Sequence, residues 1–176
     1  MVETILTRLI KILDLQPLPG EGGLFYQSYK SEDIIPIDVL PERYTGSHAF
    51  CTAIYYLLSN DPDSFSAFHR LPTDEIYHFY LGDPVEMHLL FPDGTSQLVL
   101  LGSDLFGGQQ VQFVVPCGVW QGSRLKDGGR FALLGTTMSP GFETSDYVPG
   151  DREALIRQFP DHVEWIQRLT RQAHQP

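Results

Sequence analysis

The stretch Phe65–Gly82, FSAFHRLPTDEIYHFYLG, decides how the rest of the chain is interpreted. Residues 65–69 are rich in aromatic side chains, residues 71–74 have the composition of a turn, and residues 75–81 again favour a strand. The pattern predicts two adjoining strands joined by a turn. A histidine, a carboxylate and several tyrosines lie on them, which makes this stretch the candidate site.

The second of these strands places one carboxylate on an otherwise aromatic face. Side chains alternate along a strand, so Glu75 shares a face with Tyr77 and Phe79. Burial of an unpaired carboxylate is costly, and we therefore expect Glu75 to be partnered, metal-bound or lining a wet cavity. The alternative is that Glu75 pairs with an arginine and only stabilises the fold.

Size and composition limit the classes of protein to consider. With 176 residues, of which 42% are hydrophobic, the chain is long enough for one domain with a sizeable core. A net charge of -10 without basic clustering argues against a nucleic-acid partner. The two cysteines, Cys51 and Cys117, lie in apolar segments and are expected to be buried thiols, as in a reducing compartment.

No segment has the pattern of a secretion signal or a membrane span. Charged residues interrupt the apolar N-terminal segment, and no apolar run reaches the length that a membrane requires. We therefore expect a soluble, cytoplasmic protein without a membrane partner.

The order of the predicted elements indicates a β core between terminal helices. Apolar residues recur at helical spacing over residues 4–14, and prolines and glycines follow. From residue 24 onward, turn residues punctuate strand-like runs at intervals of roughly ten residues, as in a sandwich or barrel. We predict a single, mainly β domain over residues 1–176, with its core at about 24–146 and further helices at about 151–171.

Four short motifs occur in an order that resembles the cupin superfamily, and in particular a branch of small, single-domain cupins of unknown function. They are Glu21-Gly22-Gly23, Phe68-His69 with Asp74-Glu75, Val115–Gln121 (VPCGVWQ) and Ser139–Glu143 (SPGFE). The branch is similar in fold to the epimerases of sugar nucleotides. The resemblance implies a jelly roll, or double-stranded β-helix, over about residues 13–146. Leu18 stands where the branch commonly has histidine, and Gly20 resembles an insertion.

Metal-binding cupins take ligands from a His-x-His pair, a glutamate and a later histidine. Here the positions two away from His69 hold Ala67 and Leu71, and the position matching the last histidine is Gln121. We therefore expect no metal cofactor. If a transition metal were bound, the resemblance implies His69, Glu75 and Gln121 as its ligands.

Without a metal, we expect His69, Glu75 and Tyr77 to be the catalytic residues. The carboxylate would hold one tautomer of the imidazole while the ring moves a proton, and Tyr77 would donate from the opposite wall. The resemblance to epimerases implies the same division between a histidine base and a tyrosine acid. The alternative is a polar network that orders the interior, or a site that only binds.

Six further residues are candidates for contact with a ligand. Trp120 can stack on a ring-shaped ligand or belong to the core, and Arg124 belongs to the densest basic cluster. Glu21, Phe25 and Tyr26 can close the mouth of a cavity or pack on an edge strand. The expected ligand-binding residues are Glu21, Phe25, Tyr26, Trp120, Gln121 and Arg124.

These observations favour a protein that binds a small polar molecule. The preferred activity is that of a metal-independent isomerase, epimerase or lyase acting on a carbohydrate-like or ring-bearing molecule. A non-catalytic sensor is the second hypothesis and a metal-dependent oxygenase the third. The polar connection over residues 31–47, the aromatic strand at 49–58 and the resemblance together predict a homodimer.

Overall fold

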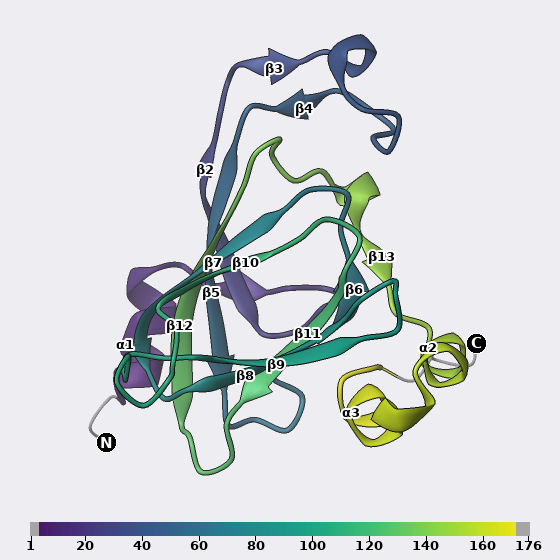
Figure 1. Cartoon of the computed structure of the whole chain (residues 1–176). Coiled ribbons are helices and arrows are strands. Elements are labelled where there is room, and N and C mark those ends of the chain that lie inside the picture. The colour runs from purple at the N-terminus through teal and green to yellow at the C-terminus, as the bar shows by residue number, and fades with distance from the viewer. Residues whose placement is uncertain (1–3, 172–176) are drawn as a thin grey trace, which may run out of the picture.

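Two antiparallel β-sheets lie face to face in the computed structural model, which describes residues 4–171 (Figure 1). The six-stranded sheet has the order β1 (Gln16–Pro17), β2 (Leu24–Lys30), β5 (Thr52–Ser59), β12 (Phe131–Met138), β7 (Glu75–Gly82) and β10 (Gln112–Val115). The five-stranded sheet has the order β13 (Val148–Pro149), β6 (Phe65–Arg70), β11 (Trp120–Leu125), β8 (Val85–Leu90) and β9 (Ser96–Leu101). The mainly β, jelly-roll prediction is confirmed.

The core lies between the two sheets and follows from the alternation of side chains. In β7, Glu75, Tyr77 and Phe79 are buried, whereas Ile76 and His78 are half-buried on the other face. The inward-facing residues of both sheets form one apolar cluster, which includes Tyr56, Tyr77, Phe79, Met87, Leu89 and Leu134. The predicted face shared by Glu75, Tyr77 and Phe79 is therefore the lumen face.

Helices cover part of the outer face of each sheet. Helix α1 (Ile5–Ile12) packs through Leu9 on Leu57 and Leu133 of the six-stranded sheet. Helices α2 (Arg152–Gln158) and α3 (Val163–Arg168) pack on Phe68 and Leu90 of the other sheet. Because α2 and α3 cover its outer face, β6 is buried on both sides, and its backbone gives His69 a rigid support.

Strands β6 and β7 are not neighbours, which corrects one prediction. Strand β6 belongs to the five-stranded sheet and β7 to the six-stranded sheet, and the loop over residues 71–74 crosses between them. The turn residues were identified correctly, but they connect two sheets and do not close a hairpin. As a result, His69 and Glu75 lie on opposite walls of the lumen.

Two other segments differ from the sequence-based expectations. The predicted strand at 49–58 is divided between β4 (His48–Ala49) and β5, and β4 pairs with β3 (Ile34–Ile35) in an arm that extends beyond the sheets (Figure 1). Strand β11 was not anticipated, because Gly122 lies in its middle. That glycine allows close packing, since an added Cβ would lie 3.2 Å from the Phe68 ring.

The remaining local features concern the thiols and helix ends. Cys117 is exposed and Cys51 is half-buried, and both are free thiols, so the expectation of two buried thiols is wrong for Cys117. Short 3-10 helices occur at Ile37–Val39, Thr144–Asp146 and Pro160–His162. No helix within residues 4–171 is both long enough and apolar enough to cross a membrane.

Candidate functional site

A pocket of about 620 Å³ opens between the two sheets and contains both His69 and Glu75. Its walls come from β2, β5, β6, β7 and β12, and two loops, residues 18–21 and 142–147, complete it. Apolar side chains, including Phe25, Ile54 and Met138, form much of its lining. The pocket has the size and character of small-molecule sites, in which a few polar groups lie among apolar walls.

His69 is the penultimate residue of β6 and is held in one tautomer by the main chain. Its Nδ1 lies 2.8 Å from the Ala67 carbonyl oxygen, which can only accept a hydrogen bond, so Nδ1 carries a proton. The residue is only 1% exposed, and its Nε2 has no hydrogen-bond partner among residues 4–171. In the neutral ring, Nε2 is therefore an available base inside the pocket.

Glu75 begins β7 and is buried close to His69. Its Oε2 accepts a hydrogen bond of 2.8 Å from the side-chain nitrogen of Gln121. Burial raises the pKa of Glu75 from its usual value, while the nearby His69 and the hydrogen bond from Gln121 oppose that effect. Glu75 does not hydrogen-bond to His69, so the expectation that it fixes the imidazole tautomer is wrong, and Ala67 has that role.

Glu21 reaches the pocket from the loop that follows β1. Its Oε1 accepts a hydrogen bond of 2.7 Å from Ser66 Oγ. The loop needs glycine next to it, because Gly22 has φ +109° and an added Cβ would lie 2.3 Å from the Phe65 carbonyl oxygen. The Glu-Gly-Gly sequence thus brings a carboxylate to the pocket through a close backbone approach.

Tyr147 lies against His69 on the other side. The two rings are stacked, with centroids 5.1 Å apart and an interplanar angle of 26°. The Tyr147 hydroxyl is buried and has no hydrogen-bond partner in the described part of the chain. Burial and the Glu21 carboxylate raise the pKa of this phenol, so it is a proton donor at neutral pH.

An ion pair stands among the pocket residues contributed by β2 and the 142–147 loop. Lys30 Nζ lies 2.7 Å from Glu143 Oε1, and both side chains are partly exposed. Glu143 is fixed from the other side, because its backbone nitrogen donates to Asp146. Asp146 in turn accepts from the buried His48, which connects the arm to this segment.

The structure brings together some of the predicted residues and separates others. His69, Glu75, Glu21 and Phe25 line the pocket, and Gln121 donates to Glu75 from the facing sheet without lining the pocket itself. Tyr77 is 2% exposed and does not line it: it follows Glu75 on the same face, one pleat deeper in the core. Tyr77 therefore cannot donate from the opposite wall. Burial and the Glu75 carboxylate raise the pKa of its phenol well above the usual value.

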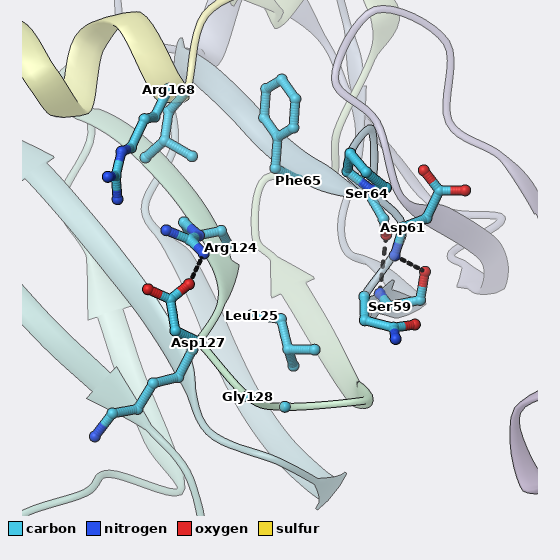
Figure 2. A pocket seen from close by; sticks show the side chains of 14 residues that line it. Ser59, Asp61, Ser64, Phe65, Arg124, Leu125, Asp127, Gly128 and Arg168 are labelled. Carbon is cyan, nitrogen blue, oxygen red and sulfur yellow. Dashed lines mark hydrogen bonds and ion pairs between the residues drawn. The ribbon is translucent and has the colours of Figure 1, made fainter.

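Three predicted ligand-binding residues point elsewhere. Tyr26 is 42% exposed and alternates with Phe25, so it lies on the outer face of β2. Trp120 packs in the cluster under α2 and α3, with the Arg70 guanidinium over its ring. Arg124 belongs to a second pocket of about 400 Å³, where it pairs with Asp127 and lies near Arg168 (Figure 2).

Comparison with known proteins identifies the family. The family model described as "Cupin superfamily (DUF985)" matches residues 7–148. The chain belongs to this cupin family. The uncharacterised protein YML079W of Saccharomyces cerevisiae is 29% identical over 137 residues, which are 73% of this chain and 67% of the yeast protein.

Solved structures show the same cupin architecture. Protein SO0799 of Shewanella oneidensis is 33% identical, with a TM-score of 0.82, over 98% of this chain and 100% of that protein. A hypothetical protein from Leishmania major is 27% identical, also with a TM-score of 0.82, over 94% and 98% of the two chains. A cupin 2 domain-containing protein from Halorhodospira halophila, 10% identical with a TM-score of 0.53 over 86% and 85%, shares the fold alone.

The donor set of this cupin does not fit a transition metal. His69 and Glu75 are conventional ligands, but Gln121 directs its amide nitrogen, a hydrogen-bond donor, at Glu75. Within residues 4–171 no three histidine, cysteine, aspartate or glutamate side chains are grouped so that they could hold a metal. We therefore derive no chemical step through a metal.

The site also contains residues that the sequence did not single out as site residues: Lys30, Thr136, Phe142, Glu143 and Tyr147. Phe142 and Glu143 belong to the SPGFE motif, which served only to support the resemblance. Tyr147 follows the same motif closely in the chain. The SPGFE motif was therefore the available sequence signal for Phe142, Glu143 and Tyr147. No sequence signal indicated Thr136.

Proposed function

We propose that this cupin binds a small ring-bearing molecule and moves a proton on it without a metal, as an isomerase, epimerase or lyase would. The observation that carries the proposal is the state of His69. Its Nδ1 proton is committed to the Ala67 carbonyl, and its Nε2 is left without a partner inside the pocket. A fixed tautomer with one free nitrogen is what a general base requires.

Glu75 supports this chemistry electrostatically. When Nε2 takes a proton from the ligand, the ring becomes an imidazolium, and the nearby Glu75 carboxylate stabilises that charge in a buried site. When Glu75 is instead protonated, a state that burial favours by raising its pKa, the carboxyl group is a proton donor to the ligand. The Tyr147 hydroxyl, which has no hydrogen-bond partner within residues 4–171, replaces Tyr77 as the candidate acid.

Binding without turnover is the second candidate, and one observation favours it. Glu75 is hydrogen-bonded to Gln121 and makes no hydrogen bond to His69, an arrangement that also suits a carboxylate that orders the lumen of a binding protein. A metal-dependent oxygenase has no comparable support, because the donor set is incomplete.

The experiment begins with a thermal-shift screen of carbohydrates, nucleobases, amines and organic acids. A ligand present at about one hundred times its dissociation constant adds roughly 2.7 kcal/mol of stability. Each ligand found is then incubated in D2O, and mass spectrometry measures deuterium incorporated at carbon.

The wild-type protein should exchange a carbon-bound proton or convert the ligand, and His69→Asn should not. Asparagine is the matched change, because its amide can still donate to the Ala67 carbonyl while the base is lost. A ligand that binds in the pocket but is recovered without deuterium and unchanged would refute the proton-transfer function and leave the binding function.

A further inference from the structure

The pocket has an acidic charge balance. Its lining includes three carboxylates, Glu21, Glu75 and Glu143, and one lysine, Lys30. That lysine is already paired with Glu143 at 2.7 Å. Even with Glu75 protonated, the carboxylates outnumber the lysine, and within residues 4–171 the Glu21 side chain has a neutral serine, not a cation, as its hydrogen-bond partner.

The nearest other cation does not reverse this balance. Arg171 donates to the Glu21 backbone carbonyl and to the Asp63 carbonyl, and its guanidinium lies over the Phe65 ring, 4.5 Å from the centroid. Arg171 is not among the residues that line the pocket. Its guanidinium is engaged by two backbone carbonyls and an aromatic ring, so it does not offer the pocket an unpaired side-chain cation.

His69, one of the polar groups free to contact a ligand, has the same preference for a positively charged donor. His69 is 1% exposed and lines the pocket, and its Nε2, unpartnered within residues 4–171, accepts a hydrogen bond when the ring is neutral. Phe25 and Phe142 add aromatic rings to the lining. Aromatic faces attract cations, and carboxylates repel phosphate.

We infer that the pocket selects a compact ring-bearing molecule with a positively charged nitrogen, such as a cyclic or aryl amine, and disfavours phosphorylated ligands. The inference deepens the proposed function and rests on it for the location of the site. It also separates this cupin from enzymes that bind sugar nucleotides, because phosphates need basic side chains and the one lysine in this pocket's lining is already paired with Glu143.

Three probes of one shape test the charge preference: benzylammonium, benzyl alcohol and benzyl phosphate, titrated at pH 7 and followed by protein NMR. Benzylammonium should bind most tightly and benzyl phosphate least, with at least about a tenfold difference, as expected for one charge near a protein surface. Equal or tighter binding of the phosphate, or no binding of any probe, would overturn the inference.

A matched pair of variants separates the pocket from the overall charge of the chain. Glu21→Gln should reduce the preference for benzylammonium several-fold and leave benzyl alcohol unaffected, since Gln can still accept from Ser66. Asp61→Asn, which removes a carboxylate from the second pocket, should change neither (Figure 2). Equal effects of the two variants would overturn the inference. The proposed proton transfer is tested separately, by deuterium exchange. A failure of the charge preference can therefore be distinguished from a failure of the proton-transfer function.

Discussion

His69 and Glu75 lie on opposite walls of one pocket although only the loop over residues 71–74 and the last residue of β6 separate them in the chain. The loop crosses from the five-stranded to the six-stranded sheet, so the base and the carboxyl group approach the ligand from two sides. A hairpin would have placed them on one wall. The crossing is therefore the feature of the fold that allows His69 and Glu75 to act on opposite sides of one bound ligand.

The first prediction concerns stability and pH at Glu75. Burial raises the pKa of this carboxyl from 4.5, so its contribution to stability is present below that value and is lost as the pH rises through the raised pKa. Glu75→Gln should therefore increase the free energy of unfolding at pH 7 by about 0.5–2 kcal/mol, and the gain should shrink towards pH 4. Urea denaturation at both pH values measures it.

Glu143→Gln is the control for this prediction. Glu143 is partly exposed and paired with Lys30, so its replacement should change stability by less than about 1 kcal/mol. A Glu75→Gln protein that is less stable than wild type at pH 7, or whose gain does not depend on pH, would contradict the assignment of Glu75 as a buried carboxyl with a raised pKa.

The second prediction concerns Gly22, the glycine that follows Glu21, with Gly128 in another loop as its control. Gly22 and Gly128 both have positive φ, but only at Gly22 would an added Cβ meet the backbone. Gly128→Ala should cost about 1–2 kcal/mol for the left-handed conformation alone, and Gly22→Ala should cost about 3 kcal/mol or more. Thermal denaturation checks the order. Equal costs would mean that the loop moves freely and that Glu21 is not fixed.

The third prediction concerns metal content. Because the donor set is incomplete, protein purified without chelators should hold well under one equivalent of transition metal by elemental analysis. Gln121→His places an imidazole next to Glu75 and near His69, and this variant should bind zinc or nickel more tightly than the wild type. Stoichiometric metal in the wild type would restore the oxygenase hypothesis.

The fourth prediction concerns assembly. Tyr26, Tyr80 and Val114 are 42%, 50% and 46% exposed on strands of the six-stranded sheet, which α1 covers only in part. We propose that a second copy of the chain covers this face, since exposed apolar patches usually mark interfaces. Light scattering should give a dimer at micromolar concentration, and Tyr80→Lys should shift it towards monomer. A monomeric wild type would remove the proposal.

The sequence predicted the strands well where short-range patterns determine them. Alternation in β7 identified its lumen face, and helical spacing identified α1. Strand β11 was missed because its central glycine serves packing against Phe68, a contact between segments far apart in the chain. Pairing of strands across sheets is likewise a long-range property, so the position of β6 relative to β7 was wrong.

The site shows the same division between local and long-range information. His69 and Glu75 were identified from residue type and motif, and both line the pocket. The partner of each was not predictable, because Ala67 binds His69 through the backbone and Gln121 reaches Glu75 across the lumen. Trp120 and Arg124 lie outside the pocket. Their positions were predicted wrongly because a bulky or charged residue type does not by itself indicate which face of a strand the side chain occupies.

The tautomer of His69 tests the central claim most directly, and it requires no ligand. Nitrogen-15 NMR of histidine-labelled protein, assigned with His69→Asn, distinguishes a protonated ring nitrogen from one with a free lone pair. The account predicts that, in the neutral ring, Nδ1 is protonated and Nε2 is not, because the Ala67 carbonyl oxygen accepts from Nδ1 at 2.8 Å. A neutral His69 with its proton on Nε2 would leave the pocket without its base and would contradict the proposed function.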